Sequence, residues 1–103
     1  MMTPEQINIE YLLTCKGWTK NKQGRMVDPH GQVRPKGMIP DYNTASATER
    51  GLMLDAITAD CTFTIISRNE DNGRFRVGGH PPGDTLNKAL MRACIALKVK
   101  VKV

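Results

Sequence analysis

The sequence predicts an α+β domain in which three helices pack on a small antiparallel sheet, in the order α-ββ-α-ββ-α. Three observations lead to this prediction. Apolar residues recur at helical spacing in three segments, two turn-rich stretches separate those segments, and each predicted element has one apolar face. At 103 residues the chain can form one hydrophobic core, so we expect a single domain over residues 1–103.

The first predicted helix spans residues 4–16. Thr3 can cap it, and Pro4 suits its first position, where the missing N–H would have no helical partner. Gln6 can complete a capping box with Thr3. Apolar residues then recur with a helical period as far as Gly17, which provides the stop.

Two further helices are predicted in the second half of the chain. Ser46 and Glu49 form a second capping-box pattern before the middle helix. The last helix begins after Asp84, which we expect to cap it. Its apolar stripe consists of Leu86, Ala89, Leu90, Ala93, Cys94 and Leu97. The tail, residues 99–103, alternates valine and lysine, which predicts either a late strand or a frayed helix end.

Two β stretches separate these helices. Residues 18–34 predict a short hairpin or meander, because "NKQG" and "DPHG" both have the composition of tight turns. The segments "CTFTIISRN" and "RFRVGG" predict a second hairpin, with Asn72–Gly73 as a type I′ turn or with a loop one or two residues earlier. Its core face would carry Phe63, Ile65, Phe75 and Val77. Its outer face would carry Thr62, Thr64, Arg68, Arg74 and Arg76.

The composition predicts an ordinary globular chain, with 40% hydrophobic and 24% charged residues. No apolar run is long enough to span a bilayer, and the first ten residues are polar and acidic rather than basic and apolar as in a secretory signal. We therefore expect a cytoplasmic location, without membrane attachment. The three cysteines are odd in number and far apart, which favours reduced core residues over disulfides.

The order of motifs along the chain resembles a known family. The opening "TPEQINIEYLLTCKGW", the segment "IPDYN" before the middle helix and the closing "NKALMRACIAL" are similar to the phage αβα-sandwich domain family. The matching positions are Asn8, Gly17-Trp18 and Pro40-Asp41-Tyr42, whereas "NTASAT" replaces a more acidic link and the valine tail is atypical. The resemblance implies a phage or prophage origin and an α+β fold. It supplies no catalytic residues.

The search for reactive groups argues against an enzyme. No two cysteines or histidines are close enough in the sequence to form the ligand pairs of a zinc site, so we expect no metal. The chain has no nucleophile elbow and no phosphate-binding lysine loop, and its carboxylates are scattered. We therefore expect no cofactor and no catalytic residues.

Two surfaces remain as candidate binding sites. The first is the outer face of the second hairpin, which is suited to docking a protein. A phosphate at the following helix N-terminus is disfavoured, because Asp84 would occupy it. The second surface is the segment 16–36, which holds six of the fifteen lysines and arginines and only one acid, Asp28. Its candidate phosphate contacts are Lys20, Lys22, Arg25, Arg34 and Lys36, whereas Trp18 fits a core anchor better than a stacking platform.

These surfaces give two hypotheses of different classes. In the favoured one, the chain is a non-enzymatic phage or prophage accessory protein that binds a host or phage protein through the hairpin face. In the alternative, segment 16–36 binds nucleic acid or a small nucleotide, although no nucleic-acid motif is present. A third hypothesis is an assembly role with self-association into a homo-oligomer through an unpaired edge strand.

Overall fold

The computed structural model describes residues 2–60 and 65–102. The α-helices are α1 (Pro4–Cys15), α2 (Ala47–Asp60) and α3 (Leu86–Leu97), and the strands are β1 (Thr19–Lys20), β2 (Met26–Val27), β3 (Ile66–Arg68) and β4 (Phe75–Val77). Two 3-10 turns, η1 (Lys36–Met38) and η2 (Tyr42–Thr44), lie between β2 and α2. The predicted α+β class and the order α-ββ-α-ββ-α are confirmed.

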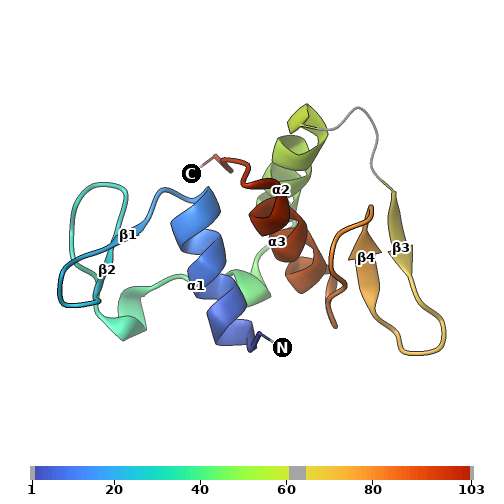
Figure 1. The fold of residues 1–103 in the computed structure, drawn as a ribbon, viewed down its shortest axis with the longest axis horizontal. Helices are drawn as coiled ribbons and strands as arrows, with labels where there is room; N and C mark the ends of the chain where they lie inside the picture. The colour runs from blue at the N-terminus through green and yellow to red at the C-terminus, as the bar shows by residue number, and fades with distance from the viewer. Residues whose placement is uncertain (1, 61–64, 103) are drawn as a thin grey trace.

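The strands form two separate antiparallel pairs, β1 with β2 and β3 with β4, rather than one sheet. Figure 1 shows the two hairpins at opposite ends of the molecule, with the helices between them. The strands are two or three residues long, so neither pair offers an apolar face wide enough to cover three helices. The helices therefore bury their apolar faces mainly against one another.

Helix α3 is the centre of the core and packs against α1, α2 and β4. Its predicted stripe is confirmed and is wider than expected, because Met91 is fully buried as well as Leu90 and Cys94. The other main contributions come from Tyr11 of α1 and Met53 of α2, each with no exposed surface. A one-sided helix between two others is thus the main source of apolar burial in the described chain.

The helix ends follow the capping rules, with one correction. The Thr3–Gln6 capping box of α1 is confirmed, and Gly17 has the positive φ of 80° that the predicted stop requires. The prediction that Asp84 caps α3 is wrong, because Thr85 accepts the N–H of Lys88 instead. A threonine one residue closer to the helix takes the cap, which leaves the Asp84 carboxylate available for an ion pair.

At the start of α2 only half of the predicted capping box forms. Ser46 Oγ accepts the N–H of Glu49 at 3.4 Å. The Glu49 carboxylate lies instead 3.6 Å from the ammonium group of Lys16. Attraction to this buried lysine draws the glutamate away from the position that would close the box.

The tail is neither a strand nor a frayed helix within the described residues. Lys98 ends α3 in a left-handed conformation, and the chain then runs extended along the end of α1. Val99 and Val101 are buried, and the N–H of Val101 donates to the carbonyl of Cys15 at 2.9 Å. The described valines of the tail are therefore buried and its lysines are exposed, as the alternating pattern predicted. The described tail residues nevertheless do not pair with a strand.

Buried polar side chains hold the segments between the helices. They are Asn8, Lys16, Asp28 and Asn87. The amide of Asn8 donates to the carbonyl of Pro40 and accepts the N–H of Tyr42, both at 2.8 Å. One side chain of α1 thus satisfies a donor and an acceptor of the connecting backbone.

Asn87 and Lys16 also bind backbone groups of the segments that pack against the helices. Asn87 of α3 donates to the carbonyls of Asn43 and Ala45 at 3.0 and 3.2 Å. Lys16 Nζ donates to the carbonyl of Lys102 at 2.6 Å and so holds the tail against α1. Each of these backbone groups would otherwise lack a helical or sheet partner at that contact, and leaving it unpaired would cost free energy.

This arrangement predicts that Asn8 is a stability residue. Replacing Asn8 by alanine removes two hydrogen bonds to partly buried backbone groups and should lower the free energy of unfolding by about 2–3 kcal/mol. Urea denaturation followed by circular dichroism measures this loss. Gln23→Ala, at an exposed position, is the matched control and should change stability by less than about 0.5 kcal/mol. Equal small losses for both variants would contradict the anchoring role of Asn8.

Candidate functional site

The pairing of β3 with β4 decides which side chains share a face of the C-terminal hairpin. Ile66 lies opposite Val77, Ser67 opposite Arg76, and Arg68 opposite Phe75. Directly opposed residues in an antiparallel pair lie on the same face. One face therefore carries Ile66, Arg68, Phe75 and Val77, and the other carries Ser67, Arg74 and Arg76.

Two sequence predictions for this hairpin are wrong as a result. Arg68 lies on the face of the core residues, with its guanidinium 5.5 Å from the centre of the Phe75 ring, whereas Arg74 and Arg76 belong to the other face of the strand pair. Ile65, predicted to be buried, is 57% exposed. The predicted site residues Thr62 and Thr64, and the predicted core residue Phe63, lie outside the described residues.

The loop of this hairpin also differs from the expected one. The Asn69 N–H donates to the Arg74 carbonyl at 2.8 Å, so the loop contains residues 70–73 instead of a two-residue Asn72–Gly73 turn. Gly73 alone has a positive φ, of 69°, whereas a type I′ turn would need one at Asn72 too. The two-residue turn and the four-residue loop both oppose even-numbered residues of β3 to odd-numbered residues of β4. Arg68 therefore shares a face with Phe75 and Val77 in either case, which the expected face pattern did not allow for.

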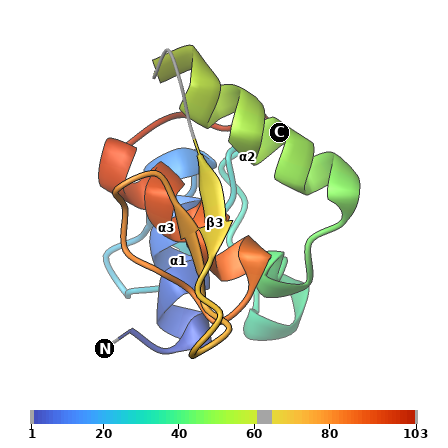
Figure 2. The same ribbon diagram turned by 90° about the vertical axis from the view of Figure 1, so that its right-hand side faces the viewer.

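The outer edge of β3 is open. Hydrogen bonds join residue 65 to 78 and residue 69 to 74, so the alternation of an antiparallel ladder turns the N–H and C=O groups of Ile66 and Arg68 away from β4. On the other side of β4, by contrast, Phe75 exchanges two hydrogen bonds with Gly83, both at 2.9 Å. Figure 2 shows β3 on the outside of the molecule, facing the viewer. Within the described part of the chain, no strand pairs with this edge.

The surface beside this edge is polar and hollowed. A hollow of about 330 Å³ is lined by Ser67, Arg68, Asn69, Asn72, Arg74, Arg76 and Pro82. The structure thus brings together the three arginines that the sequence proposed as binding residues. Sequence reasoning missed Ser67 and did not assign the unpaired edge strand of its third hypothesis to this hairpin. The adjacent residues Ile65 and Ile66 could have indicated an exposed apolar surface on this strand. Neighbouring residues of a strand face opposite sides, so one of the two isoleucines must point outward.

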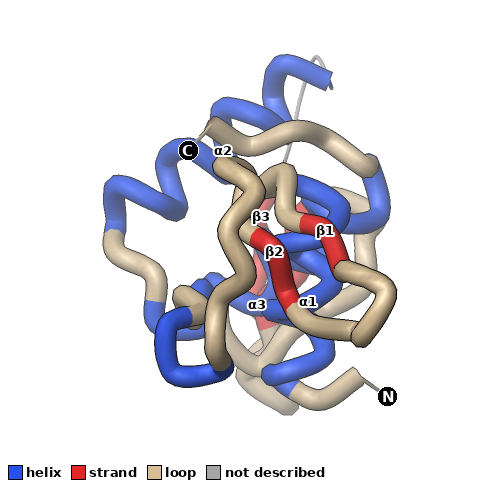
Figure 3. Tube along the Cα trace, turned by 90° about the vertical axis from the view of Figure 1, so that its left-hand side faces the viewer, coloured by secondary structure: helices blue, strands red, loops and turns tan. Residues whose placement is uncertain are grey.

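The basic segment 16–36 is less available than its composition suggested. Lys16 is only 2% exposed, Arg34 Nε lies 2.8 Å from the Asp28 carboxylate, and Lys36 Nζ lies 3.6 Å from Glu5. Lys20, Lys22 and Arg25 remain exposed on the hairpin β1–β2, which faces the viewer in Figure 3. Of the predicted phosphate contacts, only Arg34 is held in a partly buried ion pair, because the Lys36 and Glu5 side chains are 88% and 70% exposed.

The aromatic and thiol groups are core residues. Trp18 is 8% exposed and packs with Leu12 and Met26, as its interpretation as a core anchor predicted. Burial raises the pKa of Cys15 to about 11 and the pKa of Cys94 to about 12, and both thiols are free. Cys61 lies outside the described residues. Among the residues described, no group of three or more histidine, cysteine or carboxylate side chains could hold a metal ion.

A set of ionisable groups also converges in the interior. The Lys16 ammonium lies 5.2 Å from the centre of the Tyr42 ring, which makes an edge contact with Tyr11, and 3.6 Å from Glu49. Burial raises the pKa of both tyrosines, so their hydroxyl groups stay protonated. Tyr11 and Lys16 are almost entirely covered, which excludes direct contact with a substrate in this conformation. This cluster joins α1, α2 and the connecting segment.

Comparisons with known proteins add no relative. No family model, no curated protein and no solved structure matches the chain. The resemblance to the phage αβα-sandwich domain family therefore stays a prediction. No described helix is both long enough and apolar enough to cross a membrane.

The carboxylate of Asp28 predicts a specific pH dependence of stability. Its hydrogen bonds from the Gln32 N–H, the Arg34 side chain and the His30 N–H outweigh its burial and hold its pKa below the ordinary value of 3.8. Because the folded pKa is depressed, the stabilisation is present above the ordinary pKa and is lost as the pH falls through the folded pKa.

We therefore expect the stability advantage of the native chain over Asp28→Asn to narrow as the pH falls below about 4. Urea unfolding of both chains at a series of pH values measures the difference. A difference that stays constant from neutral to strongly acidic pH would show that the Asp28 carboxylate does not stabilise this hairpin.

Proposed function

We propose that the chain is a small non-enzymatic phage or prophage accessory protein that binds a host or phage protein through its C-terminal hairpin. An extended segment of the partner would pair with β3 as an additional strand. The open outer edge of β3 is the observation that carries this proposal, because its outward N–H and C=O groups are a template for another chain.

The side chains along this edge fit strand addition. Ile65 and Ile66 are 57% and 41% exposed, so a partner strand would cover apolar surface as it forms backbone hydrogen bonds. β3 contains no proline, and its single charged residue, Arg68, stands at its end. Proline and interior charges are common means of blocking such edges, and β3 lacks them.

The adjacent hollow supplies selectivity for acidic segments. Arg76 lies opposite Ser67, whose small side chain leaves the face between the arginine and an added strand uncovered. A carboxylate on that face of the partner would meet the guanidinium of Arg76. Charge complementarity of this kind contributes more to specificity and to the association rate than to affinity.

The residues that carry the phage resemblance have structural roles. Asn8 and the Pro40-Asp41-Tyr42 segment, two separate parts of the motif, bind each other through two hydrogen bonds. Gly17 ends α1, and the N–H of Trp18 donates to the carbonyl of Leu12 at 3.1 Å. These motif residues have roles in the fold, which suits a family without shared catalytic residues.

Nucleic-acid binding through segment 16–36 is the second candidate. It is favoured by the exposure of Lys20, Lys22 and Arg25 on one small hairpin. It is weakened because Lys16 is buried beside Glu49 and Arg34 is paired with Asp28, which leaves fewer charges for phosphates. We rank it below the edge-strand proposal.

Substitution of Ile66 tests the proposed interface. Ile66→Pro removes an outward N–H but no hydrogen bond of the hairpin, and Ile66→Thr removes similar apolar surface while it keeps the N–H. A protein captured by the native chain from nuclease-treated bacterial lysate should bind Ile66→Pro about tenfold more weakly than Ile66→Thr. Arg76→Glu should also weaken binding, and thermal unfolding checks that each variant is folded.

The double variant Lys20→Glu and Lys22→Glu is the control at the opposite end of the molecule. We expect it to leave the capture unchanged. If capture instead fails with this variant, or disappears after nuclease treatment, nucleic-acid binding through segment 16–36 is favoured and the edge-strand proposal is wrong.

A further inference from the structure

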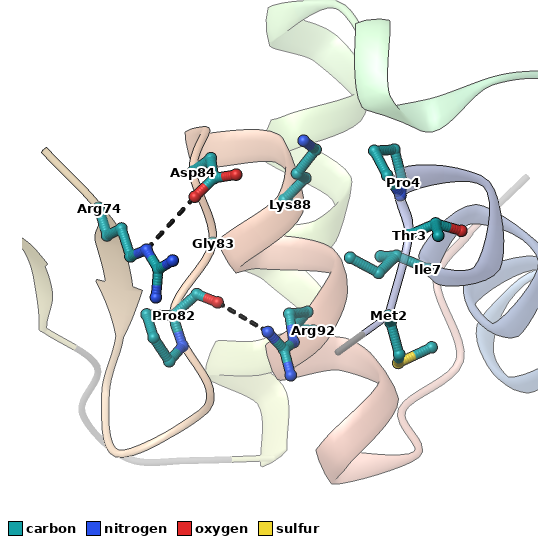
Figure 4. A pocket seen from close by; sticks show the side chains of 10 residues that line it. All are labelled: Met2, Thr3, Pro4, Ile7, Arg74, Pro82, Gly83, Asp84, Lys88 and Arg92. Carbon is teal, nitrogen blue, oxygen red and sulfur yellow. Dashed lines mark hydrogen bonds and ion pairs between the residues drawn. The ribbon is translucent and has the colours of Figure 1, made fainter. Parts of the chain in front are cut away.

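A second hollow lies between the start of α1, the first turns of α3 and the segment before α3. It has a volume of about 290 Å³ and is lined by Met2, Thr3, Pro4, Ile7, Arg74, Pro82, Gly83, Asp84, Lys88 and Arg92. Figure 4 shows the side chains of α3 between those of the hairpin end and those at the start of α1. Three cations and one carboxylate line this hollow, which leaves an excess of positive charge.

The cations come from two elements and are held in different ways. Lys88 and Arg92 are four residues apart on α3 and therefore lie on the same side of the helix. Arg92 donates to the carbonyl of Pro82 at 3.0 Å, which orients its guanidinium and leaves further donors available. Among the described residues, neither Lys88 nor Arg92 has an acidic partner within ion-pair distance.

Asp84 supplies the only negative charge of the hollow. Its carboxylate lies 3.4 Å from Arg74 Nε, and the two side chains are 68% and 42% exposed. An exposed ion pair of this length contributes little to stability, so an incoming anion can replace Asp84 as the partner of Arg74. Because Thr85 is the cap of α3, movement of Asp84 would not uncap the helix.

We propose that this hollow binds a small organic anion, with a carboxylate or phosphate head joined to a short apolar group. The head would contact Arg92 and Arg74, whose charged donors suit oxyanions, and the Lys88 side chain, whose ammonium points away from both arginines in Figure 4, would turn toward it. The apolar group would lie against Met2, Pro4 and Pro82, which line the same hollow. This inference does not depend on the strand-addition proposal, since the open edge of β3 is not part of the hollow.

Titration with sodium butyrate and with monobutyl phosphate, followed by amide chemical shifts at constant ionic strength, tests the site. Both probes should give saturable shifts at Gly83, Lys88 and Arg92, and butylammonium should give none. Tighter binding of butyrate assigns the site to carboxylates, and tighter binding of monobutyl phosphate assigns it to phosphates. Absence of a saturable shift at tens of millimolar probe would overturn the proposal.

Matched variants distinguish binding in this hollow from general electrostatic attraction of an anion to a basic protein. Arg92→Gln and Lys88→Gln should each weaken binding about fivefold or more, whereas Lys20→Gln, at the far hairpin, should have no effect. Asp84→Asn removes the competing carboxylate and should strengthen binding several-fold, whereas Asp71→Asn makes the same change of net charge in the hairpin loop and should not. Equal effects of Asp84→Asn and Asp71→Asn would refute the site.

Discussion

Hydrogen bonding of the backbone outside the helices is the constraint on which the rest of this structure depends. The connecting segments pack against the helices, where their N–H and C=O groups need partners, and buried side chains supply them. Asn8 holds the segment before α2, and Asn87 holds it from the other side. Lys16 holds the tail. The helices thus bury their apolar surface around α3 while the long connections stay fixed to them.

The two hairpins differ in how fully this requirement is met. In the N-terminal hairpin, Asp28 binds two backbone N–H groups of its turn and the side chain of Arg34, so a charged group stabilises the turn and also neutralises a cation. In the C-terminal hairpin, β4 has hydrogen bonds on both of its sides and β3 on only one. This difference between the two ends is the reason that we propose a protein partner before a nucleic acid.

Local signals in the sequence predicted the helices well, because capping residues and the 3.6-residue period act within a few positions. The Thr3–Gln6 box, the stop at Gly17 and the stripe of α3 are examples. The strand faces were predictable but were assigned wrongly, because any loop with an even number of residues places Arg68 on the same face as Phe75. The exact register was not predictable, because Asn69 and Asn72 stabilise a four-residue loop through their own side chains. The burial of Lys16 was not predicted, because it depends on the carbonyl of Lys102, which is far away in the sequence. The cap of α3 was misplaced, because Asp84 and Thr85 are adjacent and both residue types can cap a helix. The candidate arginines were found, but not the open edge beside them.

Amide hydrogen exchange of the native chain, measured residue by residue, tests the central claim most directly. Side-chain anchoring should protect the N–H of Tyr42 and Gln32, which donate to the Asn8 and Asp28 side chains instead of to backbone carbonyls. In β3, the N–H of Ser67 should exchange slowly because it faces β4, and those of Ile66 and Arg68 should exchange rapidly because they face outward. Protection of Ile66 and Arg68 equal to that of Ser67, or rapid exchange at Tyr42, would contradict this account of the molecule.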